Sequence, residues 1–143
     1  MNASDFVGTY KGKGHELVDG DGKVTHARDP ASERPSRIVY TAEGLVIVVS
    51  TPPDRRPLDC KHIAGASDAD LIAAARGVVA YAGRYEVKGN KVYHHIDVSF
   101  FPNWVGGANV RDFKFEGNLL ILTTQPDEKG AVERIFWERV ERA

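Results

Sequence analysis

The stretch Gly83–Phe101, GRYEVKGNKVYHHIDVSFF, has the pattern of two strands joined by a tight turn. Gly89 and Asn90 at its centre accept the positive φ angles that a two-residue hairpin turn requires. Such a turn places Tyr85 opposite His94 and Val87 opposite Val92. Side chains alternate between the two faces of a strand, so one face carries Val92, His94, Ile96, Val98 and Phe100. That face is apolar apart from the histidine, and we expect it to point into the core.

Further strands of this kind run through most of the chain. RDFKFEGNLLILTT, residues 111–124, turns on a second Gly-Asn pair, and TAEG separates two strands at residues 38–40 and 45–50. The loop expected at residues 29–36 contains two prolines. We also expect strands within residues 6–18, 23–28 and 131–140. About eight strands in so short a chain predict an all-β fold, a small closed antiparallel barrel forming a single domain over residues 1–143.

One helix is expected in the middle of the chain. Ser67 is a suitable N-cap residue, and Asp70 follows it at the spacing of a capping box. Apolar residues then recur at helical spacing: Leu71, Ile72, Ala75, Val78 and Val79. The pattern predicts a helix from Ser67 onward with one apolar face, ending near Gly83.

Composition excludes several classes of function. The net charge is -1, which gives no basic field for nucleic acid or an anionic membrane. The first residues lack the apolar core of a secretory signal, and no apolar run is long enough to cross a bilayer. The single cysteine, Cys60, cannot form an internal disulfide. We therefore expect a cytoplasmic protein.

Two polar side chains are predicted to share the apolar interior. Arg111 shares a strand face with Phe113 and Phe115, and the opposite face carries only charged residues, at positions 112, 114 and 116. Arg111 should therefore point inward, as His94 does. A buried guanidinium requires a partner. That partner is either structural, such as Glu86, Asp97 or a loop carbonyl, or a ligand. In the second case Arg111 and His94, with Tyr40, Tyr81, Tyr85, Phe100 and Phe113, would line a ligand pocket.

Other candidates lie at the end of the His94 strand and on its other face. Asn103 and Trp104 follow Pro102 and either seal the barrel end or contact a ligand at its mouth. His95, Asp97 and Ser99 share a strand face but lack the exposed turn and oxyanion hole of a hydrolase. Adjacent His94 and His95 point to opposite faces, so no metal site is expected. We expect no cofactor; haem on His94 is the weaker alternative.

The chain resembles a known family in several segments. These are GTY at residues 8–10, VYTAEG at 39–44, AAARGVVAYAGRYEV at 73–87, HHIDVSFFPNWVG at 94–106, RDFKFEGNLLILTT at 111–124 and the terminal WERV. They resemble the stand-alone lipocalin-like domains of bacteria and fungi, from about Val7 to Val140. Tyr10 departs from the tryptophan usual in that family. The resemblance implies a calycin-type barrel that holds a ligand, but no single reaction.

Three functions are compatible with these residues. The first is a small-molecule binding barrel for an apolar, aromatic or polyketide-like ligand, with His94 and Arg111 reading an oxygen function. The second is a cofactor-independent isomerase, cyclase, dehydratase or lyase, with His94 as general acid or base and Arg111 stabilising an oxyanion. The third is a barrel filled by its own side chains, with a structural or assembly role. A small molecule is the expected partner, and a homodimer is possible.

Overall fold

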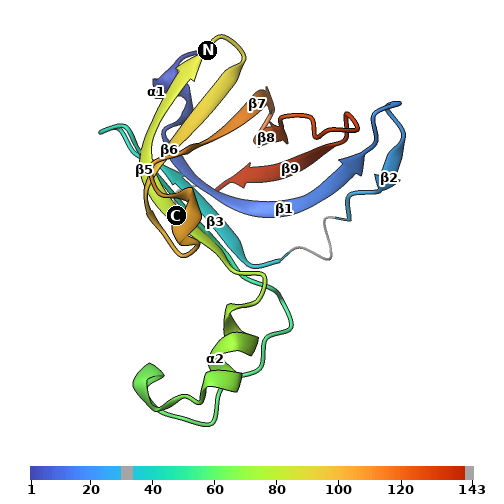
Figure 1. The fold of residues 1–143 in the computed structure, drawn as a ribbon. Helices are drawn as coiled ribbons and strands as arrows, with labels where there is room; N and C mark the ends of the chain where they lie inside the picture. Colours follow the sequence, from blue (N-terminus) through green and yellow to red (C-terminus); the bar gives the residue numbers. More distant parts are fainter. Residues whose placement is uncertain (30–33, 141–143) are drawn as a thin grey trace.

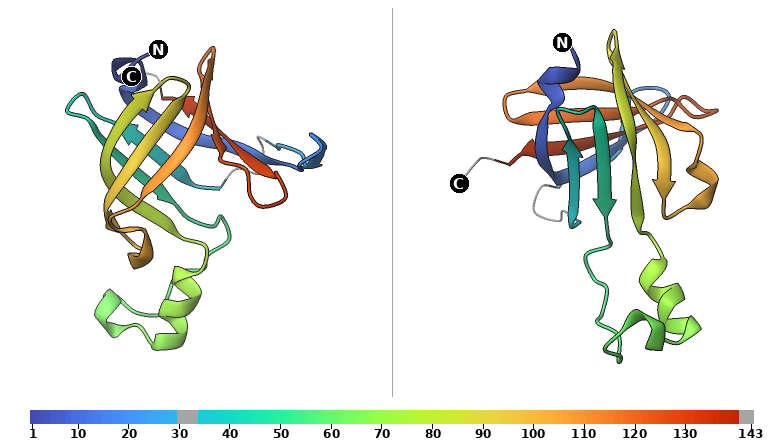
Figure 2. Two further views of the ribbon diagram at one scale, coloured as in Figure 1. Left: turned by 45° about the horizontal axis from the view of Figure 1, so that its top comes forward. Right: turned by 90° about the vertical axis from the view of Figure 1, so that its left-hand side faces the viewer.

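A computed structural model describes residues 1–29 and 34–140 and confirms the closed antiparallel barrel. Figures 1 and 2 show its strands wrapped around one interior. Nine strands form one sheet; β2 pairs only with β1, and the other eight close into a barrel through pairing of β1 with β9. The strands are β1 (Gly8–Val18), β2 (Val24–His26), β3 (Ser36–Tyr40), β4 (Leu45–Ser50), β5 (Val79–Lys88), β6 (Lys91–Ser99), β7 (Ala108–Glu116), β8 (Leu119–Thr124) and β9 (Val132–Arg139). The loop predicted at residues 29–36 falls partly on residues 30–33, outside the described residues.

The predicted hairpin registers are confirmed. In the β5–β6 hairpin Tyr85 pairs with His94 and Val87 with Val92, and Gly89 has a φ of 61°. The β7–β8 turn brings Glu116 opposite Leu119. Val92, His94 and Ile96 are all buried, as alternation from this turn requires. The turn residues therefore place His94 inside the barrel.

The alternation fails beyond Ile96, where the expected inward face was wrong. Gly83 pairs with Ile96 but the preceding Ala82 pairs with Val98, so Asp97 is an extra residue in β6. This bulge exchanges the two faces of the strand. As a result Val98 is 65% exposed and Phe100 is 52% exposed. The predicted inward position of these two side chains is corrected accordingly.

An aromatic cluster fills one end of the barrel. The short helix α1 (Ala3–Phe6), closed by an Asn2–Asp5 capping box, inserts Phe6, which is 0% exposed. The Phe6 ring centroid lies 4.9–6.3 Å from four other rings, those of Tyr40, Tyr85, Phe113 and Phe115. The chain's own side chains therefore fill this end of the barrel.

Tyr10 fastens the helix to the barrel wall. It is fully buried, its hydroxyl donates to the Phe6 carbonyl at 2.8 Å, and the Arg139 guanidinium lies 4.8 Å from its ring centroid. Arg139 also donates to the carbonyls of Val7 and Asp5. Tyr10 thus provides a hydrogen bond to α1.

We expect Tyr10→Phe to lower the free energy of unfolding by about 1–2 kcal/mol, because the buried Phe6 carbonyl loses its hydroxyl donor. Urea denaturation would measure the change. Tyr93→Phe, on the outer face of β6, serves as the control and should stay within about 0.5 kcal/mol of wild type. Equal stabilities of the two variants would contradict the fastening role of Tyr10.

The predicted helix forms but is shorter than expected. Helix α2 (Asp68–Ala75) begins after Ser67, whose side chain accepts from the Asp70 amide, and a φ of 76° at Gly77 follows its end. Val79 starts β5, and Gly83 lies within that strand rather than at the helix end. Helix α2 buries no residue, and Figure 1 shows it standing away from the barrel, beyond the end opposite α1. In the described part of the chain, no helix has the length and apolar character needed to cross a membrane.

Candidate functional site

The half of the barrel opposite α1 holds a partly open cavity of about 380 Å³. Apolar side chains of five strands form much of its wall: Ile38, Val48, Val79, Leu122 and Ile135. His15, Arg34 and Glu133 add charged or titratable groups to its lining. A cavity of this size is at the small end of ligand sites in proteins. The barrel is therefore filled at one end and hollow at the other.

A hydrogen-bonded chain of three side chains crosses the interior where the filled and hollow halves meet. Tyr40 on β3, His94 on β6 and Tyr81 on β5 are all buried. The Tyr40 hydroxyl lies 2.7 Å from Nε2 of His94, and the Tyr81 hydroxyl lies 2.7 Å from Nδ1. His94 and Tyr81 line the cavity, whereas Tyr40 packs against Phe6 on the filled side. Both ring nitrogens of His94 are therefore engaged.

Burial keeps His94 neutral. Loss of solvation, followed by the charge of Arg111 and the proximity of His95, lowers the pKa of His94 from 6.5 to about 3. Burial also raises the pKa of Tyr40 well above 10.0 and raises that of Tyr81. At neutral pH the three groups are an imidazole and two phenols.

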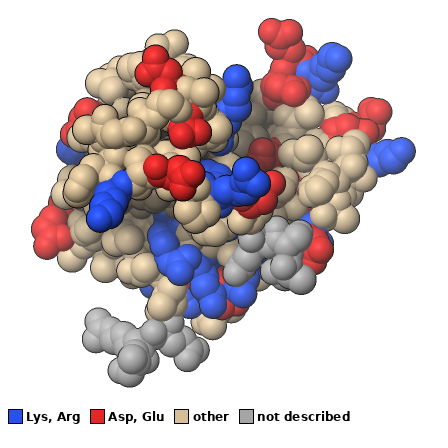
Figure 3. Space-filling model, turned by 90° about the horizontal axis from the view of Figure 1, so that it is seen from below, with Lys and Arg blue, Asp and Glu red and all other residues tan. Residues whose placement is uncertain are grey.

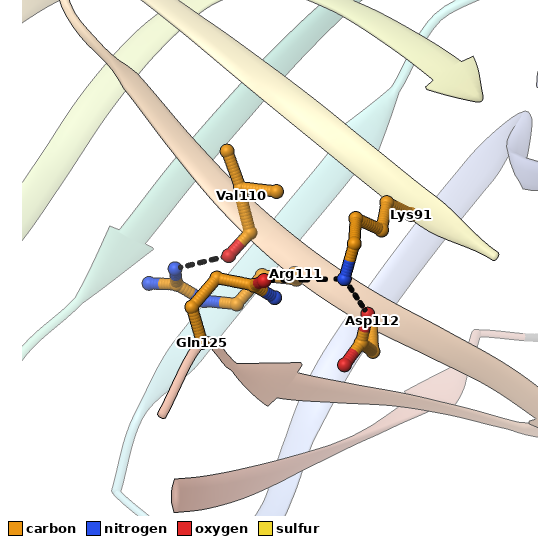
Figure 4. Close-up of polar contacts among 5 residues, drawn as sticks. All are labelled: Lys91, Val110, Arg111, Asp112 and Gln125. Atoms are coloured by element: carbon orange, nitrogen blue, oxygen red, sulfur yellow. Dashed lines mark hydrogen bonds and ion pairs between the residues drawn. The ribbon is translucent and has the colours of Figure 1, made fainter. Parts of the chain in front are cut away.

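Arg111 points into the cavity, as the strand pattern predicts. Its Nη1 donates to the Val110 carbonyl at 2.9 Å. Figure 4 shows the guanidinium directed away from the neighbouring Lys91–Asp112 ion pair. Within residues 1–29 and 34–140, no carboxylate forms an ion pair with Arg111. Glu86, one of the predicted partners, instead accepts a hydrogen bond from Nε2 of His95 at 2.6 Å, and Asp97 is exposed.

The other predicted ligand-binding residues divide into three groups. Trp104, in the 3-10 turn η3 (Pro102–Trp104), lines the cavity and makes an edge-on contact with Tyr81 at 5.9 Å between centroids. Tyr85 and Phe113 belong to the aromatic cluster around Phe6. Phe100 and Asn103 are exposed and do not line the cavity. Of the nine candidates, the cavity brings together His94, Arg111, Tyr81 and Trp104.

Sequence reasoning missed two polar residues of the cavity wall. Trp137 on β9 is 5% exposed, and its Nε1 has no hydrogen-bond partner among the described residues. Asn109 on β7 lines the cavity, and its side-chain amide counteracts the rise in the pKa of Tyr81 that burial causes. Asn109 lies two positions before Arg111 on the same strand face, and that spacing could have identified it.

The arrangement of the remaining titratable groups offers little for metal or haem. Among residues 1–29 and 34–140, no three His, Cys, Asp or Glu side chains are placed to hold a metal ion. An axial bond from His94 to haem iron would require breaking one of its two tyrosine contacts.

The surface charge is mixed on the face of the molecule seen from the α2 side. Figure 3 shows Lys and Arg side chains interspersed with Asp and Glu on this face.

Comparison with known proteins agrees with this architecture. The model of the lipocalin-like domain family matches residues 7–140. A curated relative, the 4'-hydroxy-3'-methoxypropiophenone carrier protein of Aspergillus oryzae, is 32% identical over 66 residues. The match covers 41% of this chain and 60% of the relative, so the chain spans less than two thirds of that protein. By its family match over nearly the whole barrel, this chain belongs to the lipocalin-like domain family.

Proposed function

We propose that the protein binds an apolar, aromatic small molecule that carries an oxygen function, and that the barrel cavity is its binding site. The observation that carries the proposal is the cavity of about 380 Å³ with apolar walls and a guanidinium that lacks a carboxylate partner among the described residues. Ligand sites in proteins combine these features: mostly apolar surface and a few polar groups that fix orientation.

Arg111 supports an oxygen-bearing ligand. A guanidinium has five N–H donors, and the Val110 carbonyl accepts from only one nitrogen of this group. The remaining donors facing an apolar cavity would gain from a carbonyl or phenolate oxygen, since hydrogen bonds to charged groups contribute about 1.5–3 kcal/mol. The aromatic rings of Tyr81, Trp104 and Trp137 suit a flat ligand.

The similar carrier protein narrows the proposed ligand class. The compound in its name, 4'-hydroxy-3'-methoxypropiophenone, is an aromatic ketone with a phenolic hydroxyl, which presents both a flat ring and oxygen acceptors. The residues that line the cavity of this chain favour the same two properties in a ligand, a flat ring and an oxygen acceptor. We therefore propose an aryl ketone or a polyketide-like aromatic as the ligand class.

The contacts of His94 favour binding over catalysis. A general base needs a free lone pair toward the substrate, and a general acid needs a proton at working pH. Both nitrogens of His94 contact tyrosines, and a pKa of about 3 leaves the ring neutral. We therefore assign His94 a positioning role and propose a carrier or binding protein rather than an isomerase or lyase.

Tryptophan fluorescence provides a direct test. The chain has two tryptophans, Trp104 and Trp137, and both line the cavity. We expect 4'-hydroxy-3'-methoxypropiophenone to change their emission saturably, and native mass spectrometry to detect a one-to-one complex. Arg111→Met should weaken binding about tenfold, corresponding to roughly 1.4 kcal/mol.

The control is Arg84→Met, which removes an exposed guanidinium from β5. It should leave the dissociation constant within about twofold of wild type. Unchanged emission and an unliganded mass across a panel of aromatic ketones and phenols would overturn the proposed function. Binding that Arg111→Met leaves intact would remove Arg111 from the site.

A further inference from the structure

We infer that the cavity binds its aromatic ligand in the ionised form, as a phenolate whose anionic oxygen pairs with the Arg111 guanidinium. This inference rests on the proposed binding function and adds the charge state of the ligand, which that function leaves open. It makes Arg111 the residue that selects between the neutral and the ionised form of one compound.

The positive charge of Arg111 has no counter-charge beside it. Within residues 1–29 and 34–140 no carboxylate forms an ion pair with its guanidinium, and the Val110 carbonyl, which accepts from Nη1 at 2.9 Å, is neutral. Asp112, the next residue of β7, forms its ion pair with Lys91, and Figure 4 shows the guanidinium directed away from that pair. A half-buried cation is stabilised by an anion that shares its low-dielectric surroundings.

The charge of Arg111 acts on the barrel interior. Burial is the largest cause of the pKa shifts of Tyr40, Tyr81 and His94, and the charge of Arg111 contributes to all three. It adds to the lowering of the pKa of His94 and opposes the rise in the pKa of the two tyrosines, as a nearby cation does. Because these three groups are neutral at neutral pH, none of them balances the guanidinium.

The other charged groups of the cavity lining do not balance Arg111 either. Burial lowers the pKa of Arg34, and the charge of Glu133 opposes that shift, so these two opposite charges offset each other. His15 also lines the cavity, and a histidine adds no negative charge in either protonation state. The cavity wall therefore carries the charge of Arg111 in excess.

A phenolate matches both the charge and the walls of the cavity. Its flat ring suits the aromatic rings of Tyr81 and Trp104 in the lining. A conjugated acyl group on the ring spreads the negative charge over many atoms, so this anion costs less to take out of water than a compact carboxylate does. The same conjugation lowers the pKa of the phenol below the value of about 10 for a tyrosine side chain. The ionised form is therefore accessible near neutral pH.

Burial and Arg111 act on a bound phenol in opposite directions. An apolar pocket raises the pKa of a phenol, as burial does for Tyr81. A neighbouring guanidinium lowers that pKa, because it favours the charged form. A ligand that is more ionised in the complex than in free solution is therefore a signature of Arg111 that an apolar pocket alone would not produce.

The bound ligand reports its own charge state, because a phenolate absorbs at longer wavelength than the corresponding phenol. The probe is 4'-hydroxy-3'-methoxypropiophenone, whose ionisation midpoint in buffer is measured first. Excess protein is then added at about one pH unit below that midpoint, where roughly one-tenth of the free probe is ionised. The phenolate band gives the ionised fraction in the complex.

We expect about half of the bound probe to be ionised, which corresponds to a roughly tenfold preference for the phenolate over the phenol. Arg111→Gln retains N–H donors without the charge and should return the ionised fraction to that of the free probe or below it. Arg111→Lys retains the charge and should keep the bound probe more ionised than the free probe. Arg84→Met is the control: it removes an exposed guanidinium and should leave the fraction unchanged.

A matched ligand pair separates charge from hydrogen bonding. The partner of the probe is its methyl ether, which has the same ketone but no phenol to ionise. At about one pH unit above the midpoint, where nearly all free probe is ionised, Arg111→Gln should weaken the probe about fivefold or more. It should leave the dissociation constant of the ether within about twofold of wild type.

A third ligand distinguishes the two sources of an anionic oxygen. It is the matching benzoate, in which a carboxylate replaces the acyl group and the phenol is methylated. We expect it to bind at least about tenfold more weakly than the ionised probe, because its charge is localised and costs more to desolvate. Tighter binding of the benzoate would overturn the assignment to a phenolate.

The remaining outcomes separate this inference from the function on which it rests. If neither the probe nor its ether binds, the proposed function falls, and this inference falls with it. A bound probe that is no more ionised than the free probe leaves the binding function standing and overturns this inference. Equal weakening of the probe and its ether by Arg111→Gln also overturns it, because Arg111 would then recognise a neutral oxygen. The wild-type measurement decides the inference alone if a variant does not fold.

Discussion

Between about pH 7 and about pH 4, we expect wild type to lose about 3 kcal/mol more free energy of unfolding than His94→Gln does. The cause is the buried imidazole, whose pKa falls from 6.5 to about 3 in the folded state. Glutamine retains one donor and one acceptor for the two tyrosines but has no titrating group.

The sign follows from where the proton binds. Below pH 6.5 the unfolded chain protonates His94, whereas the folded chain does so only near pH 3. Acid therefore favours the unfolded state across this window. The free energy of unfolding begins to fall as the pH drops below 6.5, the ordinary pKa of the His94 ring, and continues to fall until about pH 3. Titration of the carboxylates contributes to both proteins and cancels in the difference.

Guanidinium denaturation at several pH values, followed by tryptophan fluorescence, would measure the difference. His62→Gln is the control: His62 is exposed and should leave the pH dependence of wild type unchanged. A direct NMR titration of the wild-type His94 ring should show no protonation down to about pH 4. A midpoint near 6.5 would contradict the buried, neutral imidazole.

The hairpin registers could be predicted because short-range chemistry determines them. Gly89 and Asn90 fix which residues of β5 and β6 face each other, and alternation then places Tyr85 and His94 inside. Arg111 follows from the same rule on β7. These inferences need neighbouring strands only, and the structure confirms them.

The content of the cavity depends on long-range packing and could not be predicted. Nothing in the pattern of β3 or β5 indicates that Tyr40 and Tyr81 reach the two nitrogens of one histidine. The plug formed by Phe6 determines which half of the barrel is hollow, and it depends on the short helix α1. Trp137 has an ordinary core position, and only the coordinates reveal that its Nε1 lacks a hydrogen-bond partner among the described residues.

One error of strand alternation had a visible cause in the sequence. Gly83 lies within a run of strand-forming residues, and a glycine there commonly marks a bulge or a close approach of two backbones. The β6 bulge lies between the partners of Ala82 and Gly83, and it turns Val98 and Phe100 outward. Reading Gly83 as the end of a helix concealed this signal.

Gly83→Ala is therefore expected to be the most damaging small substitution, lowering the free energy of unfolding by at least about 4 kcal/mol. A Cβ at Gly83 would lie 1.6 Å from the His95 carbonyl oxygen and 2.7 Å from its carbonyl carbon. These are backbone atoms of the paired strand, so no side-chain rotation relieves the overlap. The strands would have to separate at the bulge, next to His94.

Denaturation of the purified variant, or its loss from the folded fraction on expression, would measure this effect. Gly65→Ala is the matched control, since its Cβ would meet only Cys60 Cβ at 3.8 Å. It should remain within about 1 kcal/mol of wild type, because ordinary van der Waals contact costs little. If Gly83→Ala were equally stable, β5 and β6 could not approach as closely as described. The bulge would then lose its role in turning the end of β6 outward while His94 stays inside.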